Sequence, residues 1–471
     1  MHDLTGLSAV DLSAAIARGD VSCVEVMQAF LDRIDALNPK LNAIVALRPR
    51  EELLAEARAA DNAPRKGWLH GLPFAIKDLA DTAGIVTARG SPIYAGHVPA
   101  QDSLLAERVR AAGAIVIGKT NTPEFGMGSH TYNPVYGMTL NPYDTTKSAG
   151  GSSGGAGAAL AARLLPVADG SDMMGSLRNP AAYNNVYGFR PSYGRVPGDN
   201  VGDVYLHELA TDGPMGRSVR DVAMLLDTLA GPDPRQPHCL PKEPSFAGRL
   251  DADVRGRRIG WLGDWDGFFA IEPDMLALCE GALDAFADLG CSVEPVVPEF
   301  DPKAVWDAWL TLRHWAISAL RQVEYADPHK RALLKPEAIW EIEGGLKLSA
   351  LDVHRASVIR SDWLRCVTGL FDRYDALVLP SAQLFPFDAA ITWPARVANR
   401  AMTTYHQWMA VVVPVSLLGL PALGMPAGFG PGGLPGGIQL FGRPGADAAI
   451  LQLGHAYHQA THWPARRPPD Q

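Results

Sequence analysis

The chain has 471 residues, of which 47 are Gly and 37 are Pro, and its formal net charge is −9. This length fits one large α/β domain or two ordinary ones, and the Gly and Pro content predicts many turn-rich connections. The negative charge argues against nucleic acid and anionic membranes as main partners, because both attract basic patches.

The first part of the chain is expected to form helices. Apolar residues at helical spacing predict a helix over 21–37, and Ser22 with Glu25 three residues later forms a capping-box pattern at its start. A second helix is expected over 50–60. Both helices are interpreted as packing elements around a sheet.

From residue 72 onward, short apolar runs alternate with helical patterns. Strands are expected at 75–76, 85–86, 114–117, 165–167 and 186–189, and helices at 102–112 and 153–164. This alternation predicts a layered α/β fold whose sheet is buried on both faces.

The second half of the chain is rich in tryptophan. Helices are expected over 218–230, 273–289 and 302–325, and the region from about 236 to 410 holds nine tryptophans. Residues 409–442 carry no charge, but five prolines and many glycines interrupt them, which favours buried strands and turns over a membrane span.

Neither the cysteines nor the N-terminal residues indicate export. The five cysteines are odd in number and lack C-x-x-C spacing, so they are interpreted as buried or incidental thiols in a reducing compartment. The start M-H-D-L-T-G-L-S has neither a basic nor an apolar leader region, so we expect a cytoplasmic protein.

Two glycine-flanked serine sites lie between residues 147 and 178: Ser152–Ser153 in G-G-S-S-G-G, and Ser176 in D-M-M-G-S. Flanking glycines allow tight turns and a close approach of substrate to the main chain. Serine is a weak nucleophile until a base activates it. Upstream, the apolar run G-L-P-F-A-I-K-D ends on Lys77, which could act as that base only if burial and hydroxyl contacts lowered its pKa from about 10.4.

The motifs G-G-S-S-G-G (150–155) and S-D-M-M-G-S-L-R-N-P-A-A (171–182) resemble the amidase signature family. The likeness continues at residues 71–78, 113–125, 212–221, 419–428 and 433–444. It implies an α/β amidase signature fold, in which helices cover both faces of a large twisted mixed β-sheet. It also implies a single domain over 1–471, with a divergent substrate-shaping region at about 236–410.

The resemblance further implies an amidase that hydrolyses a C–N amide-type bond. By matching positions, Ser176 is the nucleophile, Ser152 relays its proton from a cis peptide bond, and Lys77 is the base. Ser153 is implied as an auxiliary hydroxyl and as the cap of the following helix. No cofactor and no metal are expected, the partner is a small-molecule amide, and a homodimer is one expected assembly.

The resemblance also implies an oxyanion hole in the turn that carries the nucleophile. Its donors would be the backbone amides of Met173, Met174, Gly175 and Ser176, with Asp172 and Arg178 bracing the turn. The family pattern is D-T-G-G-S, whereas this chain has D-M-M-G-S, so Met174 replaces a glycine. Either the turn is strained by about 1–3 kcal/mol, or the thioethers make the pocket narrower and more apolar. We favour the second interpretation because the donors are backbone groups.

The methionine pair and the tryptophan-rich region predict an apolar or aromatic amide, anilide or carbamate as substrate. Two alternatives stay open: a glutaminase-like subunit of an amidotransferase, and a non-catalytic binding protein on the same scaffold. The retention of Lys77, Ser152 and Ser176 argues against the second alternative.

Three rival motifs are weaker. Residues 150–154 fit the G-x-S-x-G nucleophile elbow, but 141–147 is not expected to form the strand that an elbow requires, and no later His and acid pair is obvious. Residues 113–120 fit a P-loop pattern, but the four middle residues are apolar and look like a strand. His455, His458 and His462 could share a helix face, where a polar face is the commoner explanation than a metal site.

Overall fold

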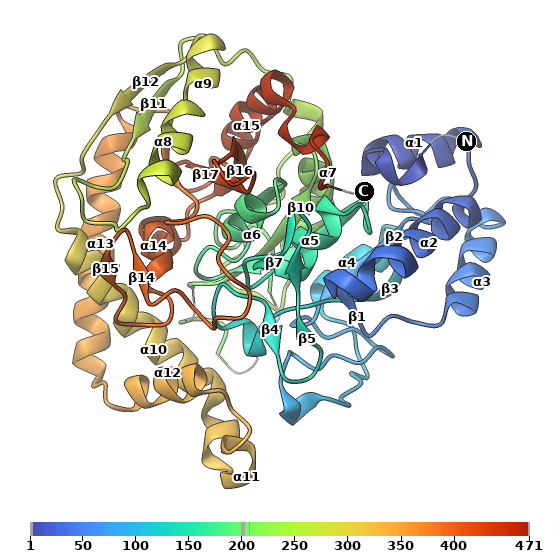
Figure 1. Cartoon of the computed structure of the whole chain (residues 1–471), viewed down its shortest axis with the longest axis horizontal. Helices are drawn as coiled ribbons and strands as arrows, with labels where there is room; N and C mark the ends of the chain where they lie inside the picture. Colours follow the sequence, from blue (N-terminus) through green and yellow to red (C-terminus); the bar gives the residue numbers. More distant parts are fainter. Residues whose placement is uncertain (1–2, 199–202, 207, 470–471) are drawn as a thin grey trace.

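A computed structural model describes residues 3–198, 203–206 and 208–469, in which helices and strands alternate along the chain (Figure 1). The α-helices are α1 (Ala9–Arg18), α2 (Cys23–Leu41), α3 (Arg50–Asp61), α4 (Leu104–Ala111), α5 (Gly154–Ala161), α6 (Arg178–Tyr183), α7 (Val219–Leu229), α8 (Pro273–Gly281), α9 (Asp284–Asp288), α10 (Pro302–Ala326), α11 (Pro328–Arg331), α12 (Pro336–Leu346), α13 (Ala350–Phe371), α14 (Val413–Leu418) and α15 (Asp447–Thr461). The 3-10 helices are η1 (Leu4–Gly6), η2 (Pro92–Tyr94), η3 (Glu124–Gly126), η4 (Ala247–Arg249), η5 (Gln407–Val412) and η6 (Trp463–Ala465).

The strands are β1 (Ile44–Val45), β2 (Pro73–Lys77), β3 (Ile115–Thr120), β4 (Tyr132–Asn133), β5 (Gly137–Met138), β6 (Leu140–Asn141), β7 (Asp144–Ser148), β8 (Val167–Asp172), β9 (Tyr187–Arg190), β10 (Thr211–Gly216), β11 (Arg258–Trp261), β12 (Ser292–Pro295), β13 (Ala376–Pro380), β14 (Arg396–Val397), β15 (Arg400–Ala401), β16 (Ala422–Phe429) and β17 (Pro435–Phe441). The local sequence pattern did not predict most of these strands.

Two sheets form the centre of the molecule. The larger one has eight strands in the order β12-β11-β13-β17-β16-β9-β10-β8, with β11 parallel to both β12 and β13 and the other pairs antiparallel. The smaller one has the order β1-β3-β2. Its edge strand β2 packs beside β8, the edge strand of the larger sheet. The predicted large mixed sheet is therefore confirmed, with a separate three-stranded sheet beside it.

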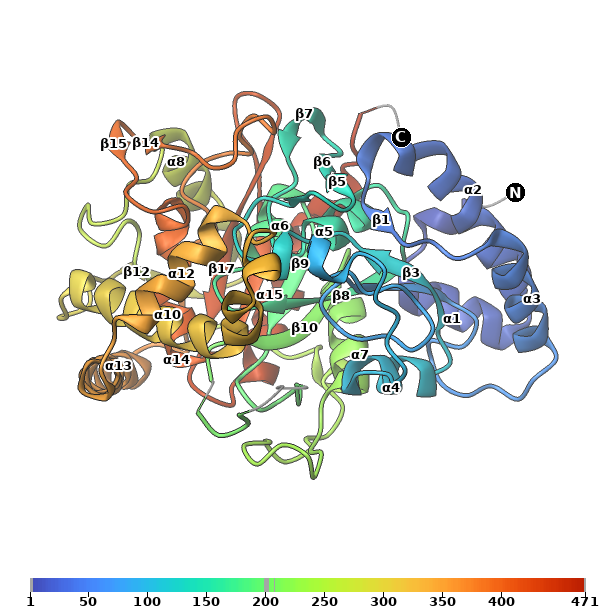
Figure 2. The ribbon, with the colours of Figure 1, turned by 90° about the horizontal axis from the view of Figure 1, so that it is seen from below.

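Helices cover both faces of the larger sheet, as predicted. In β17, a Cβ on Gly436 would contact α8, whereas a Cβ on the next residue, Gly437, would contact α6. Successive residues of a strand point to opposite faces, so α8 and α6 lie on opposite sides. Figure 2 shows the helices on both sides of the strands.

The N-terminal helices form where the apolar spacing predicted them. In α2 the Ser22 side chain accepts from the Glu25 amide and the Glu25 side chain accepts from Ser22, so the predicted capping box is present. Its buried stripe consists of Val26, Met27, Phe30, Leu31 and Ile34. Helices α3, α4, α5, α7 and α10 also lie within two or three residues of their expected bounds, whereas the pattern over 273–289 is divided between α8 and α9.

Three strand predictions were wrong. Residues 85–86 form no strand, because the Ile85 amide closes a turn on Thr82 and the Thr87 amide donates to His97. Residues 141–147 were not expected to form a strand, but β6 and β7 pair there as a hairpin outside the two central sheets. The strand expected at 165–167 begins only at residue 167 and continues to 172, since the Leu164 amide still belongs to the end of α5.

The tryptophan-rich region shares the same sheet as the rest of the chain. It supplies β11, β12 and β13, and its helices α10–α13 lie at the opposite end of the molecule from α1–α3 in both views (Figures 1 and 2). Trp309, Trp363 and Trp408 are fully buried, in keeping with the core interpretation. The uncharged stretch 409–442 forms η5, α14, β16 and β17, which are buried almost throughout. None of the helices in the described part of the chain combines the length and the apolar content that a membrane crossing requires.

Candidate active site

Lys77 lies at the end of β2, where an apolar strand brings it into the interior. Its side chain is 2% exposed, and its Nζ lies 2.8 Å from Ser152 Oγ and 2.8 Å from Ser153 Oγ. Burial lowers the pKa of Lys77 to about 7, against the opposing attraction of the Asp169, Asp212 and Asp172 carboxylates. A large fraction of this lysine is therefore neutral near pH 7.

Asp169 holds the backbone at this position. The Lys77 amide lies 3.1 and 3.2 Å from the two carboxylate oxygens of Asp169, which links β2 to β8. Burial raises the pKa of Asp169 to about 6, an effect that the bond from the Lys77 amide and the nearby lysines partly offset.

Ser152 and Ser153 lie in the loop between β7 and α5. The peptide bond between Gly151 and Ser152 is cis, as the resemblance implied. Ser153 occupies the N-cap position of α5, but its side chain makes no capping bond. The expected cap role of Ser153 is therefore wrong, because its hydroxyl is engaged with the Lys77 amine instead.

A third hydroxyl at Lys77 was missed by the sequence analysis. Ser171 Oγ lies 3.0 Å from Lys77 Nζ. Ser171 follows Asp169 by two residues in β8, and residues two apart in a strand share a face. With the full extent of β8 known, this alternation would have identified both residues together.

Ser176 lies in the turn that connects β8 to α6, and it is 7% exposed. The buried carboxylate of Asp172 organises this turn. It accepts from the Gly175 amide (2.8 Å) and the Leu177 amide (3.2 Å). These two bonds hold the backbone on either side of Ser176.

Arg178 holds the same carboxylate from the other side. Its Nε and Nη2 donate to Asp172 at 2.9 and 3.0 Å, and Arg190 forms a second buried ion pair at 3.2 Å. Burial alone raises the pKa of Asp172, but the two guanidinium groups outweigh it and hold the pKa of this carboxyl well below its usual range. The two guanidinium groups therefore favour the charged form of Asp172.

The amides expected to form the oxyanion hole do not all have free N–H groups. The Gly175 amide is already bonded to Asp172, which corrects its expected place among the donors. Within the part of the chain that the structure describes, the amides of Met173, Met174 and Ser176 donate to no protein acceptor. Three of the four expected donors thus remain open for a ligand.

The two methionines point to different surroundings. The left-handed conformation of this turn falls on Gly175, with φ of 76°, and not on Met174. The replacement of glycine by Met174 therefore carries no such strain, as we favoured. Met174 is buried in the main core, whereas Met173 is partly buried between that core and a smaller cluster that contains Phe125, Met127 and residues of α10 and α12.

Arg313 of α10 contacts Met173 directly. Its Nη1 lies 3.2 Å from Met173 Sδ, its Nη2 donates to Tyr405 Oη at 2.7 Å, and its Nε donates to the buried Glu341 at 2.6 Å. The tryptophan-rich region thus reaches the turn that carries Ser176.

The rival motifs do not build sites of their own. Residues 115–120 of the P-loop match are β3, and the buried Lys119 donates to Ala80 O and Thr82 Oγ1. Strand β7 does precede Ser152, contrary to expectation, but it belongs to an outlying hairpin and Ser152 Oγ faces Lys77. His458 contacts Tyr187, and His455 faces Asp251, within the described residues.

Comparison with known proteins gives the family of this chain. The family model Amidase matches residues 25–451. The chain belongs to the amidase family. An acylamidase of Rhodococcus erythropolis is 33% identical over 100% of this chain and 98% of its own length. A component of the glutamyl-tRNA(Gln) amidotransferase of Chloroflexus aurantiacus (strain ATCC 29366 / DSM 635 / J-10-fl) is 36% identical over 99% of both chains.

Solved structures place this amidase in the same fold. A bacterial aryl acylamidase of the amidase signature family superposes with a TM-score of 0.90 at 29% identity, covering 98% of this chain and 99% of that one. The recognised fold and family are thus confirmed, and the chain is an amide-hydrolysing enzyme.

Proposed function

We propose that this amidase cleaves its substrate through Ser176, Ser152 and Lys77, by way of an acyl-enzyme. The observation that carries the proposal is the buried Lys77 amine, which lies 2.8 Å from Ser152 Oγ and has a pKa of about 7. A buried lysine with a lowered pKa can accept a proton near neutrality.

In the first step, Ser176 Oγ attacks the carbonyl carbon of the amide. Its proton passes to Ser152 Oγ as the Ser152 proton passes to Lys77 Nζ. The carbonyl π bond opens onto oxygen, and the amides of Met173, Met174 and Ser176 bind the resulting oxyanion.

In the remaining steps, the proton first moves back through the relay, and the relay then accepts and returns a second proton. When the C–N bond breaks, the proton returns from Lys77 through Ser152 to the leaving nitrogen, and the amine departs. Water then attacks the acyl carbon and gives a proton to the relay. The relay returns that proton to Ser176 Oγ as the carboxylic acid leaves.

The substrate group nearest this turn is proposed to be apolar or aromatic. This preference is supported by the apolar side chains of Met173, Phe125 and Met127, which pack together with Ile317 of α10 and Ala338 of α12. The Rhodococcus relative is named an acylamidase and the solved structure an aryl acylamidase. In a panel of amides, anilides with apolar acyl groups should give the highest kcat/KM. Faster turnover of small polar amides would contradict this part of the proposal.

The test of the catalytic residues is covalent labelling with a fluorophosphonate, followed by peptide mapping. We expect the label on Ser176 in the unaltered chain and no label in Lys77→Ala. The control variant Lys303→Ala, which alters an exposed lysine, should leave labelling intact. Label on Ser152 would replace this proposal with a nucleophile-elbow mechanism.

A second candidate is the glutaminase step of an amidotransferase, favoured by the 36% identity to the Chloroflexus protein. Release of ammonia from glutamine distinguishes the two candidates. Rapid glutamine hydrolysis with no turnover of anilides would favour the glutaminase step.

A further inference from the structure

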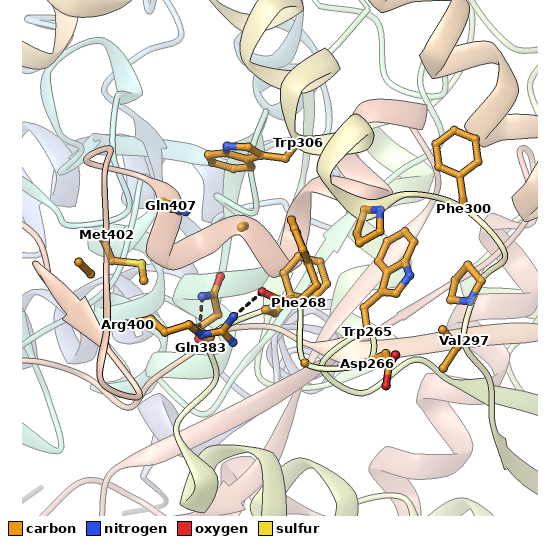
Figure 3. Close-up of a pocket in the computed structure, with 17 residues that line it drawn as sticks. Trp265, Asp266, Phe268, Val297, Phe300, Trp306, Gln383, Arg400, Met402 and Gln407 are labelled. Carbon is orange, nitrogen blue, oxygen red and sulfur yellow. Dashed lines mark hydrogen bonds between the residues drawn. The ribbon is translucent and has the colours of Figure 1, made fainter.

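A cavity of about 690 Å³ lies on the tryptophan-rich side of the molecule (Figure 3). Its walls come from the segments that follow β11, β12 and β13, namely residues 265–270, 297–302 and Gln383. These three strands are neighbours and run parallel. The cavity therefore lies outside the carboxyl ends of parallel strands, where open α/β sheets commonly bind ligands.

The walls of this cavity are mainly aromatic. Trp265, Phe268, Phe300 and Trp306 line it, and Met402 closes one side (Figure 3). Aromatic walls of this kind favour a flat apolar ligand, since rings stack and exclude water.

The backbone of one wall has an unusual conformation. Trp265 and Asp266 both adopt left-handed φ values, of 54° and 52°. Two consecutive residues with side chains rarely do so, and such positions cluster at ligand clamps. The Trp265 ring is packed against Trp363, with ring centroids 5.0 Å apart, so the conformation is held by tertiary contacts.

One end of the cavity carries a cation without a counterion. Arg400, an exposed residue of the β14–β15 hairpin, donates to Phe268 O at 3.0 Å and forms no ion pair with any residue in the described part of the chain. Figure 3 shows its guanidinium between Gln383 and Phe268, on the other side of the cavity from the carboxylate of Asp266. A guanidinium group in this position is suited to bind a carboxylate.

We propose that this cavity is a second ligand site, for a small planar aromatic carboxylate whose ring lies among the aromatic side chains and whose charge meets Arg400. The proposal does not depend on the proposed catalytic residues. Helix η5 separates the two sites: Gln407 and Ala410 line the cavity, whereas Val412 packs on Gly175 of the nucleophile turn.

The inner end of the cavity is nevertheless connected to that turn by hydrogen bonds. Gln383 Oε1 accepts from the Val411 amide at 3.1 Å, and Val411 O accepts from Gln439 Nε2 at 3.1 Å. Gln439 Oε1 in turn accepts from Arg178. A ligand that contacts Gln383 thus contacts the far end of the network that holds Asp172.

Calorimetric titration with naphthoate tests the proposal in the Ser176→Ala chain, which cannot turn over a ligand by the proposed mechanism. We expect naphthoate to bind, and neutral naphthamide to bind about tenfold more weakly, because the charged hydrogen bond is lost. Arg400→Gln should weaken naphthoate by a similar factor and leave naphthamide unchanged. Arg396→Gln, on the other strand of the hairpin, is the matched control and should change neither ligand.

A second pair of variants localises the ligand. Ala401→Trp, in the cavity wall, should abolish binding, whereas Ala395→Trp, exposed on the same hairpin but outside the cavity, should not. Binding that survives both Arg400→Gln and Ala401→Trp, or no binding by millimolar naphthoate, would overturn the proposal. An unaltered chain that binds naphthoate but hydrolyses no amide would leave this site standing and overturn the proposed function instead.

Discussion

At the scale of single residues, the protonation of Lys77 sets the expected pH dependence. The pKa of this lysine is lowered to about 7, and only the neutral amine can accept the proton of Ser152. We therefore expect kcat/KM to rise as pH increases through about 7 and to fall about tenfold for each pH unit below it. A pH–rate profile with a stable anilide substrate measures this, and a profile flat into the acid range would contradict the lysine base.

Gly175 is the residue whose conformation the turn that carries Ser176 needs. Its φ is 76°, and a Cβ there would lie 2.9 Å from Val412. Gly175→Ala should destabilise the fold by about 1–3 kcal/mol and lower kcat. Gly369→Ala, in the open part of α13, is the matched control and should be stabilising by up to about 1 kcal/mol. Urea unfolding compares the two, and equal effects would mean that the turn tolerates a side chain.

Of the residues in the candidate site, the sequence predicted those that belong to continuous motifs and missed those whose place depends on the folded structure. Lys77 ends a recognisable apolar run, Ser152, Ser153 and Ser176 lie in glycine-flanked motifs, and the structure brings the first three into hydrogen-bond contact. Ser171 was missed because its role depends on a strand that ran further than the pattern indicated. The Gly175 amide is not an open oxyanion donor because it bonds to the Asp172 carboxylate. No motif specifies this side-chain geometry.

At the scale of elements, one ion pair ties β8 to α6. Arg178 and Asp172 are both fully buried, and Arg178 also donates to Ser416 Oγ at 2.6 Å. Arg178→Met should destabilise the fold by about 3–5 kcal/mol, because it removes one of the two guanidinium groups that neutralise the buried Asp172 carboxylate and leaves Arg190 to do so alone. The exposed pair Arg220–Asp251 provides the control, since Arg220→Met should cost at most about 1 kcal/mol. Chemical unfolding of both variants measures the difference.

Helices were predicted better than strands, for a physical reason. A helix such as α2 is specified by its own apolar spacing and its capping box, both of which are local. A strand needs a partner, and β13, for example, finds its partners in β11 and β17 across long stretches of chain. Residues 85–86 are apolar but pair with no strand in the described part of the chain, whereas β7 pairs with β6 although every residue of β7 is polar.

At the scale of the whole molecule, the cysteines should behave as separate thiols. All five are free; Cys23, Cys279 and Cys291 are buried, and Cys239 and Cys366 are partly exposed. Burial raises the pKa of the Cys23 thiol to about 12, which suppresses its reactive thiolate. We expect at most two thiols to react quickly with Ellman's reagent in the native protein and five in denaturant. Rapid reaction of a third thiol under native conditions would indicate opening of the core.

The division of the central strands into two sheets is expected to affect the order of events during refolding. Lys77 belongs to the three-stranded sheet, whereas Ser171 lies in β8 of the eight-stranded sheet and Ser176 follows that strand. Neither sheet alone, however completely it has formed, can bring together the residues of the proposed relay. During refolding, reactivity toward a fluorophosphonate should therefore return later than the circular dichroism of the backbone, and its delay would time the docking of one sheet against the other.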